Sequence, residues 1–176
     1  MKFFLENRVR AGVILAVIIL ITPIFGTWRS VAVQAGRVEK EFTKKDQFGE
    51  TVSATLSDLA YHSTLFADLY EQALGKDDSC AALRRAAAEI ENRGSHPTEL
   101  GCEYTIIERN AETLFNRLLT SGEYKDDVRA AHMALCSDVS ILQKYDDYND
   151  AAKKYNKLTD LFPASFFTKK QAIVFD

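Results

Sequence analysis

Three histidines, three cysteines and a run of aspartates are the residues of this chain that could bind a metal or carry catalysis. A metal-bearing helical bundle typically uses Glu-x-x-His pairs on facing helices. The histidines are His62, His96 and His132, and the residues three positions before them are Leu59, Arg93 and Arg129. None of these supplies a carboxylate, so no metal site is predicted. Because His62 lies on an apolar stripe, we interpret it as a core histidine.

The aspartates form an acidic run on a predicted helix, made up of Asp146, Asp147, Asp150 and Asp160. A calcium-binding loop needs a glycine at its turn and a glutamate at its end, and this run has neither. Gly75-Lys76 resembles the end of a phosphate-binding loop but lacks the upstream glycine. We therefore interpret the acidic run as a solvated helix face and Gly75 as a helix terminus. No cofactor is predicted.

The cysteines Cys80, Cys102 and Cys136 are too scattered for a zinc site of the usual spacing. In an up-and-down helical layout only Cys80 and Cys136 fall at a similar height, so they form the one disulfide that geometry would allow. Buried free thiols are the other interpretation. With no catalytic motif in the chain, we expect that the protein is not an enzyme.

The 18 residues between Arg10 and Arg29 carry no charge. As a helix they would span roughly 27 Å, the short end of what crosses a bilayer. Pro23 is tolerable in such a helix if Thr22 compensates for the lost hydrogen bond. Trp28 beside Arg29 is typical of a membrane boundary. The prediction is an uncleaved anchor at residues 11–28; a cleaved signal peptide is the alternative.

The charges flanking this segment determine which side of the membrane the rest of the chain occupies. Up to Lys40 each flank carries three Lys or Arg residues, but Arg8 and Arg10 lie closer to the segment. This favours an extracytoplasmic main domain, with a cytoplasmic location as the alternative. Beyond residue 30 the chain has 18 basic and 24 acidic residues. Phosphate backbones repel such a domain, so nucleic acid is not an expected partner.

Apolar residues recur at helical spacing along most of the remaining chain. A first stripe runs over residues 33–74, with a break at 44–46, and a short Ala-rich helix is predicted at 79–93. The clearest seam is heptad-like and ends before Gly122; it consists of Leu100, Tyr104, Ile107, Ala111, Leu114 and Leu118. A last long helix is predicted from about residue 128 to 162, where Pro163 stops it.

These elements predict an all-α protein: an N-terminal transmembrane helix, then an antiparallel bundle of about four helices with long first and last helices. The expected parts are a short tail (1–10), an anchor (11–28), a helical bundle (29–163) and a C-terminal tail (164–176). Helix lengths leave residues 29–47 as a stalk above the membrane. The apolar C-terminal tail is expected to pack on this stalk or at the membrane interface.

Two Tyr-Asn pairs lie seven residues apart in the last predicted helix, Tyr148-Asn149 and Tyr155-Asn156, and Phe162-Pro163 follows them. Seven residues are two helical turns, so like residues share a face. With the single apolar segment and the Phe175-Asp176 ending, this pattern resembles that of the LemA family. Residues 44–49 and 123–126 resemble two other stretches that are typical of the family, but in altered form. The chain therefore looks like a divergent member.

The resemblance implies a membrane-anchored helical bundle. We predict a non-enzymatic scaffold or interaction protein of the cell membrane, which binds a protein partner or associates with itself. The alternative is an extracytoplasmic sensor that binds a ligand between its helices and signals through a partner membrane protein. The Tyr-Asn residues are interpreted as fixing register where they are buried. Recognition of a ligand or partner is the other interpretation.

Overall fold

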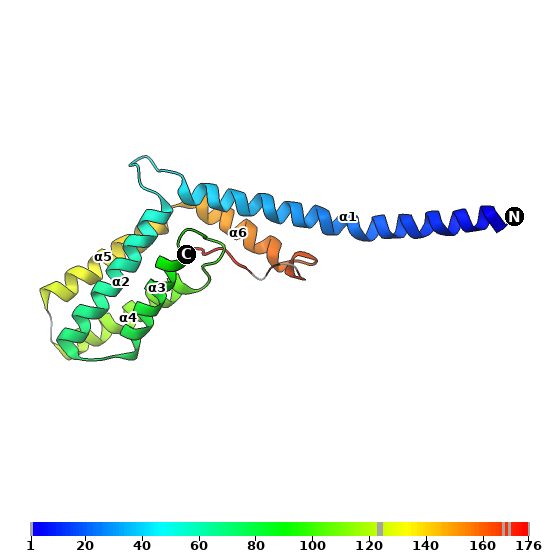
Figure 1. Cartoon of the computed structure of the whole chain (residues 1–176). Helices are drawn as coiled ribbons and strands as arrows, with labels where there is room; N and C mark the ends of the chain where they lie inside the picture. The colour runs from blue at the N-terminus through cyan, green and yellow to red at the C-terminus, as the bar shows by residue number, and fades with distance from the viewer. Residues whose placement is uncertain (1, 123–124, 167, 169, 176) are drawn as a thin grey trace.

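The computed structural model describes residues 2–122, 125–166, 168 and 170–175, and side chains from residue 11 onward apart from Leu20. The described residues are all-helical and contain no strand (Figure 1). The elements are α1 (Lys2–Thr43), α2 (Val52–Leu74), α3 (Asp78–Arg93), α4 (Glu103–Ser121), α5 (Asp126–Leu142), α6 (Asp146–Asp160) and the 3-10 turn η1 (Ala164–Phe166). The predicted fold class is confirmed.

Helix α1 carries the apolar segment through Pro23 without a break. The hydroxyls of Thr22 and Thr27 each donate to the carbonyl four residues earlier, at 2.7 Å, on either side of the proline. From residue 11 on, α1 is the one described helix long and apolar enough to cross a membrane, and none of its most apolar window is buried. A signal sequence has the same properties, so the helix by itself fits either role.

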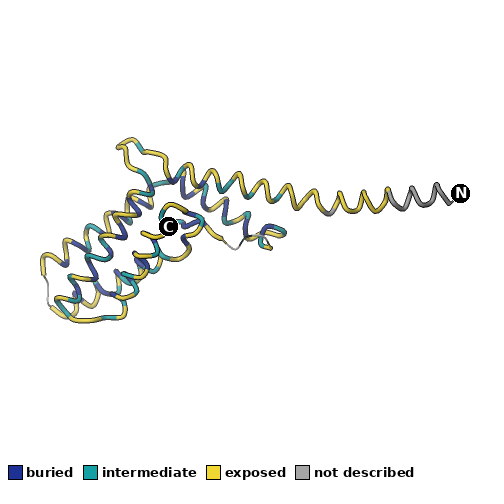
Figure 2. The backbone as a smooth tube through the Cα atoms, in the orientation of Figure 1, coloured by how far each residue is buried: buried dark blue, intermediate teal, exposed yellow. Residues whose placement is uncertain are grey.

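Helices α2 to α5 form a bundle in which α2 packs against α3 and α5, and α3 packs against α4. Figure 2 shows buried residues along their inner faces. The predicted heptad-like seam is confirmed, because all six of its residues are buried. The predicted helix ends at Gly75 and Gly122 are confirmed as well. Asp77 accepts from the Ser79 amide at 2.8 Å, and Gly75 and Gly122 adopt positive φ values of 93° and 72°.

The prediction of one long last helix is wrong, since residues 143–145 separate α5 from α6. There the amides of Lys144 and Tyr145 donate three residues back, to Ile141 and Leu142. Asp146 and Asp147 then occupy the first turn of α6, where the helix dipole favours negative charge. The break lets α5 pack on α2 while α6 packs on α1 (Figure 1). A single straight helix could not pack against both α2 and α1.

The predicted stalk is also corrected, because α6 covers one side of α1. A stripe of covered side chains faces α6 and η1; it consists of Thr27, Val31, Ala35, Val38 and Phe42. At the bundle end of this stripe, Lys44 makes an ion pair with Asp147 at 2.9 Å. Residues 27–44 and α6 thus form a two-helix arm, which leads from the apolar segment to the bundle.

Candidate functional site

Three of the four side chains in the two Tyr-Asn pairs of α6 bind the C-terminal tail. Tyr148 and Asn149 are buried. The Tyr148 hydroxyl donates to the Ile173 carbonyl at 3.0 Å, and Asn149 Oδ1 accepts from the Phe175 amide at 3.0 Å. Asn156 Nδ2 donates to the Ala172 carbonyl at 2.8 Å, and Asn156 Oδ1 accepts from the Ala172 amide at 2.7 Å. A neighbouring strand would make the same pair of hydrogen bonds. We call these three side chains the tail clamp.

The spacing of the clamp has a simple geometric basis. Asn149 and Asn156 are seven residues apart on a helix, which corresponds to about 10.5 Å. The tail residues they hold, Phe175 and Ala172, are three residues apart, which corresponds to about 10 Å in an extended chain. The tail therefore runs antiparallel to α6, with two asparagines matched to its backbone. On its other side the tail is held by Pro97, whose carbonyl accepts from the Ile173 amide at 3.2 Å.

An aromatic cluster fills the space beside the clamp. The Phe175 ring lies 5.1 Å from Tyr104 of α4 and 5.4 Å from Tyr148, and Tyr148 lies 5.6 Å from Phe42 of α1. Burial raises the pKa of Tyr148, so its hydroxyl stays a hydrogen-bond donor. The expected place of the tail is met only at its start: η1 (Ala164–Phe166) contacts α1, whereas residues 172–175 pack on α6 and α4.

The remaining residues of the family pattern lie at the end of α6. The helix stops at Asp160, two residues before Phe162, and Pro163 leads into η1. The Phe162 side chain is exposed. The last residue of the chain, Asp176, and residues 123–124 of the 123–126 stretch lie outside the described residues. The pattern is therefore split between a buried clamp and an exposed turn.

A second cluster lies between α2 and α5. His62 Nδ1 is 2.6 Å from Asp138 Oδ2, and the Asp138 side chain is buried. Burial raises the pKa of Asp138, and nearby Asp58 raises it further, while His62 opposes this shift. His62 is thus on the core stripe, as predicted, and it has an acidic partner that sequence reasoning missed. One feature of the sequence could have revealed this partner: Asp138 lies in helical register with Leu135 and Leu142, on the apolar stripe.

Asp138 borders a groove at the junction of the arm and the bundle. The groove has a volume of about 780 Å³. Its apolar part comes from Phe48, Ile141 and Tyr145, and its acidic groups are Asp46, Glu50, Asp58 and Asp138, with Lys144 as the basic residue. Glu50 and Asp58 make no ion pair with a described residue. We call this the acidic groove.

The cysteines do not pair, and the disulfide between Cys80 and Cys136 is not formed. Cys80 faces the core from α3, where burial raises its pKa to about 11, whereas Cys136 is exposed on α5. The Cys136 sulfur lies 3.6 Å from His132 Nε2. Burial raises the pKa of this thiol and lowers that of His132, so both groups are neutral near pH 7. A nucleophilic thiolate–imidazolium pair needs the opposite shifts.

No group of three or more His, Cys, Asp or Glu side chains suited to a metal ion occurs among the described residues. Comparison of the chain with protein-family models, curated proteins and solved structures finds no match. The fold and its sites define a class in physical terms: a helical bundle joined to one long N-terminal apolar helix through a clamped arm.

Asn156→Ala tests the clamp. The variant removes both hydrogen bonds to Ala172 and leaves that backbone without partners, which should weaken docking of the tail by about 1–3 kcal/mol. Hydrogen exchange of the Ala172 amide should therefore accelerate. Asn116→Ala, at an exposed position of α4, is the matched control and should leave this amide unchanged. Unaltered exchange at residues 172–175 in Asn156→Ala would contradict the role of the clamp.

His132→Phe tests the effect of pH on stability. The imidazole stacks on Phe115 with ring centres 3.8 Å apart, and its pKa in the folded protein is lowered from 6.5 by burial. As the pH falls below 6.5, the unfolded chain takes up the proton first. The contribution of neutral His132 is thus complete above pH 6.5 and is lost as the pH falls through the folded-state pKa.

Denaturant unfolding of the full chain in detergent should show a smaller loss of stability on acidification for His132→Phe than for the wild type. His96→Gln replaces an exposed histidine at a turn and serves as the control, which should keep the wild-type profile. Identical profiles for His132→Phe and the wild type would refute the assignment.

Proposed function

We propose that this protein is a membrane-anchored, non-enzymatic interaction protein of LemA type. Residues 11–28 act as an uncleaved anchor, and the bundle lies on the extracytoplasmic side. Three features support the proposal: the uninterrupted α1, the tail clamp of Tyr148, Asn149 and Asn156, and the neutral state of the Cys136–His132 pair. The arm ties the bundle to the anchor at a set distance from the bilayer.

The acidic groove is the main support for the interaction role. Its acidic side chains lie around an apolar strip, and Asp58 is close enough to Asp138 to raise that pKa. Unpaired like charges are costly next to one another, and a positively charged partner relieves the cost. The groove therefore suits a basic, amphipathic segment of a partner protein, with Ile141 and Phe48 against its apolar side.

A ligand sensor is the second candidate function. The groove volume of about 780 Å³ falls in the range of small-molecule sites. Its charge favours a cationic ligand, and Asp138, which is hydrogen-bonded to His62, lines its wall. In this alternative the arm transmits occupancy of the groove to a partner membrane protein beside α1.

Thiol labelling tests the anchor and its orientation. Cys102 is exposed, so a membrane-impermeant maleimide should label it in intact cells if the bundle faces outward. The protein should also stay in the membrane fraction after an alkaline wash. A Cys102→Ser/Cys136→Ser variant keeps only the buried Cys80 and should be labelled only after denaturation. Labelling of Cys102 that requires permeabilised cells would instead place the bundle in the cytoplasm, and release from the membrane would indicate cleavage.

Photo-crosslinking tests the groove. A photoreactive residue in place of Ile141 should yield one discrete crosslinked product in native membranes. The same residue in place of Ala88, exposed on α3, should not. Asp58→Lys should lower the yield at position 141, whereas Asp127→Lys, the same charge change at the far end of α5, should not. A product that contains two copies of this chain would identify self-association. The absence of any product at position 141 would refute the interaction role.

A further inference from the structure

Three large apolar side chains are exposed where α6 leads into η1. Leu161, Phe162 and Phe166 have exposed fractions of 55%, 80% and 79%. The two phenylalanine rings contact each other edge to face, with centres 5.8 Å apart. We call these three side chains the aromatic tip. Other aromatic residues nearby in sequence, such as Tyr155 and Phe175, are buried, so the tip is an exception within this part of the chain.

The position of the tip follows from the arm. Asp147 pairs with Lys44 at the bundle end, and α6 then runs back along α1 for 13 residues to Asp160, which corresponds to about 20 Å. The same rise along α1 leads from Lys44 to Val31, and η1 contacts α1. Thr27 is the last partly covered residue of the α1 stripe. The tip therefore lies level with residues 27–31.

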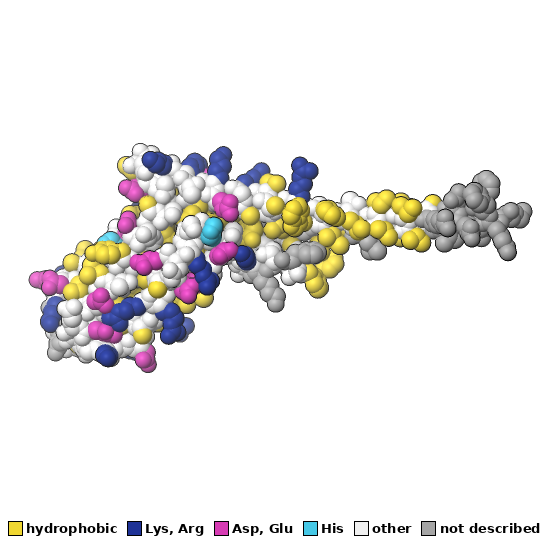
Figure 3. Space-filling model, in the orientation of Figure 1, with side chains coloured by type: hydrophobic (Ala, Val, Ile, Leu, Met, Phe, Trp, Pro, Cys, Tyr) yellow, Lys and Arg dark blue, Asp and Glu magenta, His cyan; other side chains and the backbone are white. Residues whose placement is uncertain are grey.

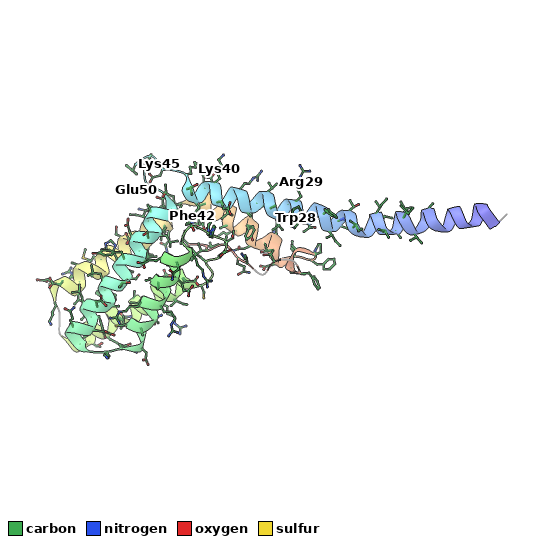
Figure 4. All side chains as sticks on the ribbon, in the orientation of Figure 1. Trp28, Arg29, Lys40, Phe42, Lys45 and Glu50 are labelled. Atoms are coloured by element: carbon green, nitrogen blue, oxygen red, sulfur yellow. The ribbon has the colours of Figure 1, made fainter. Side chains whose placement is uncertain are left out.

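This level is the edge of the apolar segment. Trp28, with an exposed fraction of 62%, and Arg29 mark it on α1 (Figure 4). Figure 3 shows hydrophobic side chains along α1 and at the nearby end of α6. The arm thus presents apolar side chains from two separate elements at one height, immediately before the segment that enters the bilayer in the proposed function.

We propose that the aromatic tip inserts into the interfacial layer of the membrane that holds α1, as a second contact beside Trp28. The inference rests on the proposed anchor. Aromatic rings favour this layer because it accepts an apolar body next to water. The continuity of the tip with the apolar segment, with Arg29 at the same level, favours a lipid surface over a protein partner. Two contacts at one height prevent α1 from turning freely about its axis, and so orient the bundle.

Tryptophan quenching tests this contact in the full chain, reconstituted in vesicles of phosphatidylcholine and phosphatidylglycerol with or without bromine on the acyl chains. Trp28 is the only tryptophan, so Trp28→Phe provides a background for Phe162→Trp. Brominated lipid should cause a loss of Phe162→Trp fluorescence comparable with that of Trp28 in the wild type, with blue-shifted emission. Phe48→Trp in the same background is the matched control: Phe48 is equally exposed, at 80%, but at the bundle end of the arm. It should not be quenched.

The outcomes separate this inference from the proposed function. If Trp28 is quenched and Phe162→Trp is not, the tip lies off the membrane and the inference fails while the anchor stands. Blue-shifted but unquenched Phe162→Trp emission means that protein covers the tip, which also overturns the inference. If Trp28 itself is not quenched, the anchor fails together with the inference. Phe166→Trp repeats the test at the second ring and decides the matter if Phe162→Trp does not fold.

Discussion

The packing of the C-terminal tail against Tyr148 is the interaction on which the rest of the structure depends. Tyr148 contacts Phe42 of α1 and Phe175 of the tail, and Phe175 reaches Tyr104 of α4. Four segments that are distant in sequence thus meet in one buried cluster. Hydrogen bonds from Asn149 and Asn156 hold the tail in register there. Because a buried backbone group without a partner is costly, the asparagines position the tail as well as attach it.

The cluster couples the arm to the bundle. Along the chain, α1 reaches the bundle through residues 44–51, which form a loop rich in polar residues. Contacts of α1 with α6 are far more extensive than those with α2. The tail then bridges α6 to Pro97 and to α4. A C-terminal segment of a few residues therefore gives a long helix and a separate bundle a defined relative orientation, which the loop would not provide.

Burial shifts the pKa values of two ionisable side chains between α2, α4 and α5 toward their neutral forms. His132 stacks on Phe115 and contacts the tilted ring of Phe66, and burial favours its neutral form. Asp138 is partnered by His62, yet burial and Asp58 still disfavour its charge. The other acidic side chains of the groove, Asp46, Glu50 and Asp58, lie with Asp138 at the junction of the arm and the bundle, at the far end of the arm from the aromatic tip. The two surfaces proposed for function, groove and tip, thus lie at opposite ends of the arm.

The sequence by itself determined most of the helical segments, the apolar segment, the buried seam on α4 and the helix ends at Gly75 and Gly122, because these depend on periodicity and on residues a few positions away. The seven-residue Tyr-Asn spacing likewise indicated one shared face. Only the tertiary structure decided what that face binds, since Asn149 and Phe175 are 26 residues apart.

The break at residues 143–145 was also decided by the tertiary structure. Asp146 and Asp147 suit an exposed helix face as well as a helix start, and packing of α5 on α2 and of α6 on α1 selects the second. The pairing of His62 with Asp138, 76 residues apart, could not be read locally for the same reason: it exists only where two helices meet.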